Sequence, residues 1–425
     1  MSRYGRDPSA WATATALALA VLLSGCSPAQ TRLPAQMRPP AQAPATPGRG
    51  APASEPPGPP LENAGGARLA DLGAIERVRF LDRRNGWATG RNGILRTEDG
   101  GASWTDVTPK VGGAATEASW NGYFLDLHTA WALRTPADPA APAVLYRTVD
   151  GGRSWAATLL RLGGVADVRF AGRLTGWILV HRNGAAGSEL VSILQSGDGG
   201  TSWTEIARTE PASRANPGSA LLEGTKTGIA SADPDHIRVT GSWAGPGVLL
   251  YRSADGGRTW SRQTIPVPAG FHADGGAGVS YPPVFSTAGE GVLPVVYTGQ
   301  GFVLYRTRNG GRTWTPSTPV RFRAEGPSPA YSIIDGEHVV VTDGVDLYRT
   351  DDGGESWTTV HPEQSLAGVT ELGFVDPSWG WAVVRGAQGT GGGAILWITL
   401  DGGRTWTGPG PGAGAPHSPP AICGN

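Results

Sequence analysis

The sequence is poor in cysteine and in charged residues, and each shortage excludes a class of protein. Its 425 residues include two cysteines and 17% charged residues, and the formal net charge is -1. Two cysteines cannot build a disulfide framework, and a net charge near zero provides no general attraction for nucleic acid. The chain has no cysteine–histidine ligand pattern and no Ser-His-Asp context, so we expect no metal, no cofactor and no catalytic triad.

Long apolar runs are also scarce, and the one near the N-terminus resembles a secretory signal. It extends from Trp11 to Leu23, follows two arginines, and is too short and too rich in small residues to span a bilayer comfortably. It ends in Leu23-Ser24-Gly25-Cys26, which is typical of a bacterial lipobox with an acylated cysteine. We expect residues 1–25 to be a lipoprotein signal peptide and Cys26 to be lipidated. The alternative is an ordinary signal or an uncleaved anchor followed by an accidental cysteine.

The lipobox also predicts where the protein resides and how it is organised. Ser27, rather than aspartate, follows the cysteine, which favours the periplasmic face of an outer membrane or, in a one-membrane cell, the extracellular face of the plasma membrane. With Cys26 lipidated, Cys423 has no partner, so the folded part must close without a disulfide. Residues 26–67 are dominated by proline, alanine and glycine and indicate a tether. We assign 68–408 to the folded domain and 409–425 to a glycine- and proline-rich tail.

Glycine is abundant, and much of it belongs to one repeated motif. The segment Thr97-Glu98-Asp99-Gly100-Gly101-Ala102-Ser103-Trp104 recurs six more times as Ser/Thr-x-Asp-x-Gly-x-Ser/Thr-Trp. The Asp side chain can accept backbone N–H bonds, and the glycines supply the positive φ of a tight hairpin. Because a catalytic acid is not needed in seven places, we interpret the motif as structural. The residues at the Asp position are Asp99, Asp150, Asp198, Asp255, Asn309, Asp352 and Asp401.

The spacing of these copies predicts the architecture. The tryptophans that end them stand at positions 104, 155, 203, 260, 314, 357 and 406, at intervals of 43 to 57 residues. A period near fifty is typical of propeller blades, which are four-stranded sheets that must pack radially to bury both faces. No interval leaves room for a hidden blade. The sequence therefore predicts an all-β, seven-bladed β-propeller with four-stranded antiparallel blades and an Asp-box in each turn between strands C and D.

A second pattern precedes the box in several repeats. Phe80, Phe124, Phe170 and Phe374 each lie seven residues before a tryptophan, and this spacing sets strands A and B. The segments Phe80-Leu81-Asp82, Gly86-Trp87-Ala88-Thr89-Gly90 and 93–104 resemble a repeat of the photosystem II assembly-factor family of seven-bladed propellers. They also resemble the wider Asp-box (BNR) class, which includes sialidases, xyloglucanases and sortilin. The family resemblance implies a non-enzymatic scaffold that holds a membrane-protein partner during assembly, although nothing in the sequence indicates photosynthesis.

The alternative function is that of a carbohydrate-binding or glycosidase propeller. A sialidase-like site needs an arginine clamp for a carboxylate, a tyrosine with a glutamate, and an acidic residue near the axis. Tyr146, Tyr251, Tyr305 and Tyr348 occupy one repeated strand position, which indicates packing, and the other tyrosines of the repeats have no recognisable partner. A xyloglucanase-like cleft would need two propellers. We therefore predict no enzyme activity, with glycoside hydrolysis as the second choice.

Arginines supply the candidate partner-binding residues. If strand direction alternates, the A–B loops and the box turns share one face of the propeller. Arginines on that face could hold an acidic protein segment or anionic head groups, although solubility and stacking on box tryptophans are the simpler explanation. The candidates are Arg83, Arg84 and Arg173 in A–B loops and Arg153, Arg258, Arg312 and Arg404 in box turns. We expect a monomer that contacts the membrane through its lipid anchor and binds an envelope or membrane protein, with a glycan as the alternative ligand and no nucleic acid.

Overall fold

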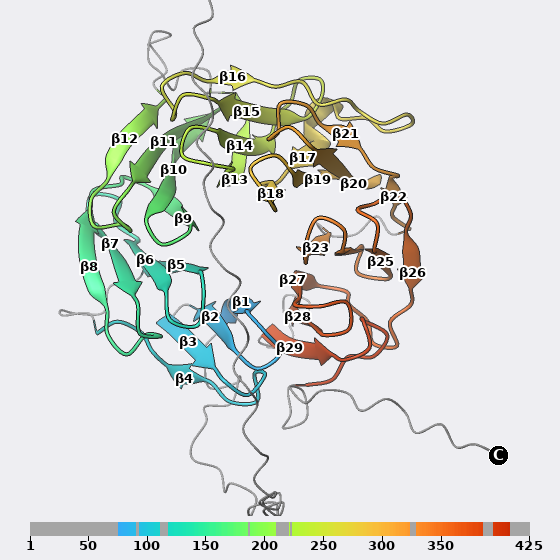
Figure 1. Ribbon diagram of the computed structural model, residues 1–425, viewed down its shortest axis with the longest axis horizontal. Coiled ribbons are helices and arrows are strands. Elements are labelled where there is room, and N and C mark those ends of the chain that lie inside the picture. The colour runs from blue at the N-terminus through green and yellow to red at the C-terminus, as the bar shows by residue number, and fades with distance from the viewer. Residues whose placement is uncertain are drawn as a thin grey trace, which may run out of the picture. The chain divides into compact units, whose positions relative to one another are not determined.

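The computed structural model describes residues 75–90, 93–110, 118–185, 188–209, 221, 223–323, 329–385 and 394–408. Within these ranges the chain forms seven antiparallel sheets, which stand around a common axis like the blades of a propeller (Figure 1). The predicted all-β, seven-bladed propeller is confirmed. The predicted signal peptide, Cys26, the tether and Cys423 lie outside the described residues. In the described part of the chain, no helix is long and apolar enough to cross a membrane.

Five blades are four-stranded meanders in which consecutive strands pair, so that strand A lies at the axis and strand D at the rim (Figure 1). Blade 1 consists of β1 (Ile75–Phe80), β2 (Gly86–Gly90), β3 (Gly93–Thr97) and β4 (Thr105–Asp106), and blade 2 of β5 (Ala118–Phe124), β6 (Ala130–Pro136), β7 (Ala143–Thr148) and β8 (Ala156–Leu160). Blade 3 consists of β9 (Val165–Ala171), β10 (Thr175–Ala185), β11 (Ser188–Ser196) and β12 (Thr204–Arg208). Blade 4 consists of β13 (Thr225–Ser231), β14 (Ile237–Ser242), β15 (Leu249–Ser253) and β16 (Ser261–Arg262), and blade 6 of β23 (Ala330–Ile333), β24 (Val339–Thr342), β25 (Leu347–Thr350) and β26 (Thr358–Val360).

Blades 5 and 7 depart from the four-stranded pattern. In blade 5 the innermost strand is split around Pro282 and Pro283, and the outermost is split before Pro319, because proline has no N–H to donate to a sheet. In blade 7, within the described residues, the place of strand D is taken by Thr407, which pairs with Ile398. Blade 5 consists of β17 (Gly278–Ser280), β18 (Val284–Phe285), β19 (Gly291–Tyr297), β20 (Gly301–Thr307), β21 (Thr315–Pro316) and β22 (Val320–Arg321), preceded by the 3-10 turn η3 (Asp274–Gly276); blade 7 consists of β27 (Val369–Phe374), β28 (Gly380–Arg385) and β29 (Ala394–Thr399).

The spacing between phenylalanine and tryptophan reflects packing between blades. The ring of Phe170 on β9 stacks at 3.7 Å on Trp131 of the preceding blade, and Phe124 on β5 stacks in the same way on Trp87. Phe80, Phe170 and Phe374 also fill the space beside the glycine that begins strand B in their own blades. A Cβ atom at Gly86 would lie 2.7 Å from the ring of Phe80, which explains why glycine precedes the strand B tryptophan there.

The buried side chains form seven clusters, and each cluster lies at one junction between neighbouring blades. At the junction of blades 2 and 3, for example, Trp131 and Leu145 meet Val168 and Phe170. A single sheet of this size cannot bury both of its faces, so each blade is stabilised mainly by its two neighbours. The core is therefore a ring of interfaces around the axis.

The seam between blades 7 and 1 closes this ring, and its bonds join residues at opposite ends of the domain. The Arg83 guanidinium pairs with the Asp376 carboxylate at 2.8 Å and also donates to the Ser378 hydroxyl at 2.8 Å. Trp381 Nε1 donates to the Val78 carbonyl at 3.2 Å, and the Val78 N–H donates to Glu371 Oε2 at 2.6 Å. Among the described residues, the contacts that hold the seam are hydrogen bonds, this ion pair and the packing of apolar side chains.

Candidate functional site

The seven box turns share one hydrogen-bonding pattern. In the first, the Thr97 hydroxyl donates to Asp99 Oδ1 at 2.8 Å and accepts the Gly101 N–H at 2.9 Å, while the Ser103 N–H donates to Asp99 Oδ1 at 2.9 Å. In blade 4 the equivalent bonds from Thr259 and Ser253 hold the pKa of Asp255 at about 2. These carboxylates already bond to their own turns, which supports a structural role for the motif.

Each box turn is also bonded to the A–B loop of its own blade, and several of the turns are bonded to the preceding blade. In every blade the N–H of the first box glycine donates to a carbonyl of the A–B loop, as Gly100 does to Arg84 at 2.8 Å. At four junctions the carbonyl of this glycine accepts a bond from the preceding blade. These bonds are Arg96 to Gly151, Trp131 to Gly199, Arg238 to Gly310 and Arg349 to Gly402. A–B loops and box turns therefore lie on one side of the propeller, which we call the box face.

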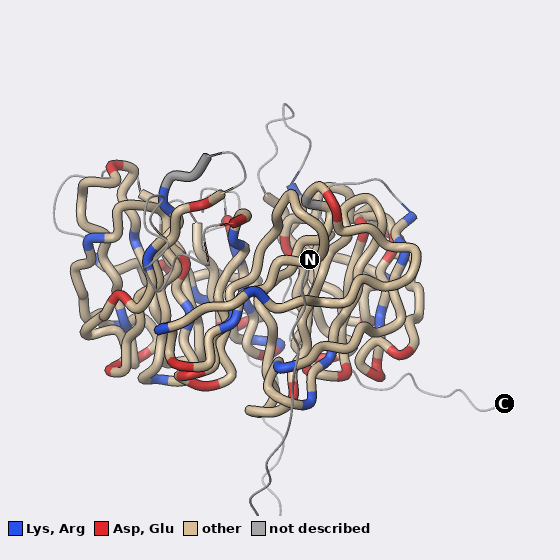
Figure 2. The backbone as a smooth tube through the Cα atoms, turned by 90° about the horizontal axis from the view of Figure 1, so that it is seen from above, with Lys and Arg blue, Asp and Glu red and all other residues tan. Residues whose placement is uncertain are grey.

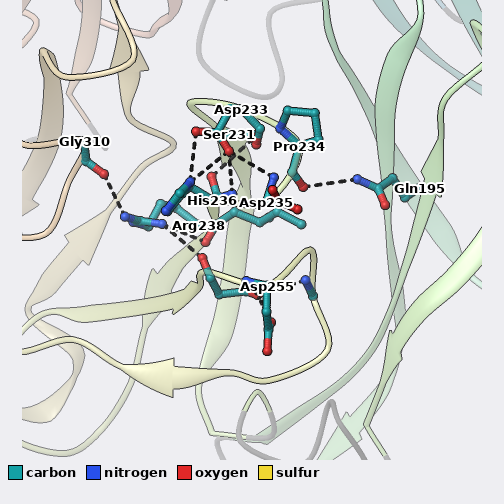
Figure 3. A network of polar contacts seen from close by, with 12 residues as sticks. Gln195, Ser231, Asp233, Pro234, Asp235, His236, Arg238, Asp255 and Gly310 are labelled. Atoms are coloured by element: carbon teal, nitrogen blue, oxygen red, sulfur yellow. Dashed lines mark hydrogen bonds and ion pairs between the residues drawn. The ribbon is translucent and has the colours of Figure 1, made fainter. Parts of the chain in front are cut away.

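Blade 4 makes this bond with an arginine of strand B, where blade 2 uses a tryptophan. Arg238 occupies the position on β14 that Trp131 has on β6, and its Nη2 donates to the Gly310 carbonyl at 2.8 Å (Figure 3). The side chain is buried and also donates to the carbonyls of Ile237 and Ser253. Burial lowers the pKa of Arg238 to about 10. In the A–B loop beside it, His236 Nδ1 bonds to the Asp233 carboxylate at 2.9 Å (Figure 3).

Two of the seven candidate arginines are held in ion pairs between neighbouring A–B loops. Arg83 pairs with Asp376 across the seam, and Arg173 pairs with Asp126 at 2.9 Å. The other five are exposed on the box face, where Arg258 donates to its own turn and Arg84 donates to the Glu98 carbonyl. Together with Arg96, Arg84 and Arg153 line a cavity of about 470 Å³ between blades 1 and 2. The remaining two exposed candidates are Arg312 and Arg404.

The arginines of the box face are accompanied by acidic residues. Basic and acidic residues are interspersed over the propeller, and neither sign has a face of its own (Figure 2). The reason is that the box turns that carry the arginines also carry the box acids, and the A–B loops add Asp82, Asp126 and Asp233. The guanidinium groups of the box face thus lie in a field of mixed sign, which weakens any attraction for a distant anion.

Arginines without internal partners lie instead on the propeller axis. A cavity of about 760 Å³ is lined by inner strands of blades 1, 2, 3, 6 and 7 and by the A–B loops of blades 1, 2, 6 and 7. Arg77 and Arg79 from β1 and Arg169 from β9 line it, together with Tyr331 from β23 and Glu371 from β27. In the part of the chain that the structure describes, the three guanidinium groups make no hydrogen bond or ion pair. We call Arg77, Arg79 and Arg169 the axial arginines.

The charges in this cavity influence one another. Burial is the main cause that lowers the pKa of Arg169, Asp167 opposes the shift, and Arg77 and Arg79 add to it by repulsion. Asp167 itself accepts the Asn121 amide at 2.6 Å and lies 3.4 Å from His181 Nε2. Burial raises the pKa of Glu371 to about 7, although the Val78 N–H bond and the arginines of β1 work in the opposite direction. Among the described inner-strand groups near the axis, three guanidinium groups therefore face two carboxyl groups, Asp167 and Glu371.

The carboxylates available in the cavity are few. Besides Glu371, the described lining includes Asp82 and Asp126. Asp82 accepts the N–H groups of its own loop, and Asp126 does the same and also pairs with Arg173. Hydrolysis of a glycoside by the usual mechanism needs two carboxyl groups on opposite sides of the bond that is cut. Within the described lining, Glu371 is the carboxyl that is not part of a loop.

The prediction of site residues missed the axial arginines, although the sequence contains a signal for them. Val78-Arg79-Phe80 and Val168-Arg169-Phe170 are identical triplets in strand A of two blades. Because side chains alternate along a strand, buried valine and phenylalanine place the arginine between them on the opposite side, toward the axis. No group of three or more histidine, cysteine or acidic side chains that could hold a metal ion occurs among the described residues.

Comparisons with known proteins find the fold but no close relative. No family model and no curated protein matches the chain. YCF48 bound to a D1 peptide is similar over 78% of this chain and 90% of that one, at 16% identity and a TM-score of 0.48. YCF48 from Cyanidioschyzon merolae covers 80% and 96%, at 18% identity and 0.47. The GH74 xyloglucanase from Xanthomonas campestris is similar over 79% of this chain and 54% of its own, at 16% identity and 0.51. At these identities the similarity shows the fold alone.

Proposed function

We propose that this chain is a lipid-anchored, extracytoplasmic binding scaffold whose axial cavity takes up an anionic segment of a protein partner in the cell envelope. The observation that carries the proposal is the convergence of Arg77, Arg79 and Arg169 on one cavity without an internal ion-pair partner. Arg77 and Arg79 are exposed within the cavity and Arg169 is partly exposed, so their guanidinium groups are accessible to a ligand of opposite charge. Guanidinium groups suit carboxylates especially well, because they can form two parallel hydrogen bonds.

The shape of the site favours a peptide segment over a large surface. A volume of about 760 Å³ is in the range that accommodates a small ligand or a few residues of a chain. The cavity includes A–B loop residues Leu81, Leu125 and Val375, so it extends toward the box face. These apolar side chains could contact the stem of an acidic segment while its carboxylate meets the arginines.

The lipid anchor rests on the sequence. The four residues that end at Cys26 support acylation, and the proline-rich stretch of 26–67 would separate the propeller from the bilayer. Cys26→Ser should abolish incorporation of radiolabelled fatty acid and release or misprocess the protein. Unchanged labelling would refute this part of the proposal.

The cavity is tested by exchanging all three axial arginines for glutamine and comparing partner recovery from detergent-solubilised membranes. A matched control replaces the exposed Arg153, Arg258 and Arg312. We expect a defined envelope protein to bind the wild type and the control, and binding to the axial variant to fall on the order of tenfold to a hundredfold, since bonds to charged groups are the strong ones. A partner that binds the axial variant normally would contradict the proposal.

The second candidate function is a carbohydrate-binding or glycosidase propeller. It is favoured by one observation, the raised pKa of Glu371 in a cavity that also holds arginines and Tyr331, because a protonated carboxyl can act as a general acid. The lack of a second carboxyl outside the loops of the described lining argues against hydrolysis. Enrichment of the protein on a glycan array, and release of sugar that is lost in Glu371→Gln, would favour this alternative.

A further inference from the structure

Glu371 occupies a position in the axial cavity that corresponds to that of an arginine in blade 1. The inner-strand phenylalanines Phe80 and Phe374 have equivalent partners in strand B, since Phe80 pairs with Gly86 and Phe374 with Gly380. Counting three residues back from each gives Arg77 in blade 1 and Glu371 in blade 7. The two blades are neighbours across the seam, so Glu371 belongs to the same layer of the cavity wall as Arg77.

The contacts of Glu371 bring its carboxylate close to the axial arginines. Its Oε2 accepts the N–H of Val78 at 2.6 Å, and Val78 is flanked in the chain by Arg77 and Arg79. The arginines of β1 are the charged groups that favour its ionised form. No other carboxylate in the described lining is so placed, since Asp82 and Asp126 bond to loop N–H groups.

The other elements around Glu371 supply one further carboxylate, that of Asp167, whose lowered pKa keeps it ionised. On β28 its partner is Val383, which is apolar, and on β23 the titratable group that lines the cavity is the phenol of Tyr331. Across the cavity β9 contributes Arg169, and also Asp167, which is bonded to Asn121 and His181. The charge of the empty cavity therefore depends on whether Glu371 is ionised.

A bound carboxylate would change this balance. In the empty protein, an ionised Glu371 partly neutralises Arg77 and Arg79. A ligand carboxylate beside the same arginines would repel Glu371, and two like charges in one site cannot both be ionised cheaply. Since burial already raises the pKa of Glu371 to about 7, a small additional repulsion is enough to protonate it near neutral pH.

We infer that Glu371 is an internal competitor for the axial arginines, and that a carboxylate ligand enters the cavity together with one proton taken up from solvent by Glu371. The inference rests on the proposed function, because it concerns the same cavity, and it adds how binding is regulated. By linkage, a site that gains a proton on binding loses affinity as pH rises. The scaffold would hold acidic segments more tightly at pH 6 than at pH 8.5.

The test uses a fluorescent peptide with four aspartates, whose carboxyl groups stay ionised between pH 6 and 8.5, and a control peptide with four asparagines. Fluorescence anisotropy measures the dissociation constant of the full-length protein across this range. We expect the wild type to lose affinity for the aspartate peptide on the order of fivefold to tenfold as pH rises. Glu371→Gln should bind tightly at every pH, since glutamine still offers an oxygen to Val78 but carries no charge.

Proton uptake and thermal stability are measured as well. Calorimetric titration at pH 8 in buffers of different ionisation enthalpy should show proton uptake by the wild type and none by Glu371→Gln. The exposed Glu363 supplies the matched control, and Glu363→Gln should behave like the wild type. Unchanged melting of Glu371→Gln verifies that the seam is intact.

The possible outcomes distinguish the role of Glu371 from the proposed binding function. Peptide binding that requires the axial arginines but does not change with pH or with Glu371→Gln overturns this inference and leaves the proposed function standing. Peptide binding that is unaffected when the axial arginines become glutamine overturns both. The absence of peptide binding at every pH also overturns both.

Discussion

The arginines of the box face and the axial arginines differ in how they are arranged. Arg153, Arg258, Arg312 and Arg404 occur at one repeated slot, are exposed, and share their turns with box acids or an amide. Arg77, Arg79 and Arg169 follow no sevenfold repeat, and within the described residues they make no direct ion pair, although the carboxylates of Asp167 and Glu371 lie near enough to interact with them. In a propeller, a motif found in every blade, such as the box turn, stabilises the blade and its packing on its neighbours. Departures from the repeat are where one ligand can be recognised.

The largest loss of stability is expected when a tryptophan of strand B is removed from the junction between two blades. Trp131 is fully buried, stacks on Phe170 at 3.7 Å and donates to the Gly199 carbonyl. Trp131→Ala should lower the free energy of unfolding by about 3 to 5 kcal/mol, because it leaves a large cavity between two blades. Chemical denaturation measures this loss. Trp243→Ala, at a half-buried position of blade 4, should cost much less, and equal costs would contradict the role of the junctions.

A box acid should have a smaller effect on stability and none on binding. Asp255→Ala removes the acceptor for the Ser253 and Thr259 hydroxyls and for the Thr259 N–H. We expect a loss on the order of 1 to 3 kcal/mol, because donors are left unpaired in a closed turn. Thermal melting compares this variant with Asp274→Ala, whose side chain is exposed. If binding vanished while melting stayed the same, the boxes would be functional rather than structural.

The bonds of His181 to Asp167 and Glu189 predict that the free energy of unfolding depends on pH, with an effect similar to or smaller than that of the box acid. Burial disfavours the charged form of His181, but bonds to Asp167 and Glu189 outweigh it and raise its pKa to about 9. The stabilisation from a raised histidine pKa is complete below about pH 6.5 and is lost as pH rises through about 9. We expect the unfolding free energy of the wild type to fall by on the order of 1 to 2 kcal/mol across this window, relative to His181→Gln. Parallel curves for the two proteins would disprove the assignment.

The smallest effect is expected on the box face. Exchanging Arg153, Arg258 and Arg312 together for glutamine should alter binding of the aspartate peptide by less than about twofold, because exposed charges in a mixed field contribute little. A salt series tests the comparison further, since binding at the axis should remain after salt has screened the surface. A large loss of peptide affinity in this variant would place the binding site on the box face and not at the axis.

Much of the fold could be predicted because it depends on local chemistry repeated along the chain. The positive φ of Gly100 and Gly101 and the acceptor at Asp99 specify a turn within eight residues, and seven copies specify seven blades. The split of blade 5 was not predicted, although prolines cause it. The presence of Arg238 at the position that Trp131 has in blade 2 was not predicted either, because only the packed junctions show that both side chains donate to the equivalent box glycine carbonyl of the next blade.

The sequence by itself determined the strands, their order and the side on which the box turns lie, because these follow from spacing and from the alternation of side chains. Only the tertiary structure decided which charges are paired. Arg83 finds Asp376, 293 positions away, whereas Arg77 and Arg169 come together from separate blades without an ion-pair partner. The physical reason is that ring closure sets the surroundings of every inner strand at once. A local pattern such as the Val-Arg-Phe triplet indicates that an arginine faces the axis, but it does not show which charges from other blades meet it there.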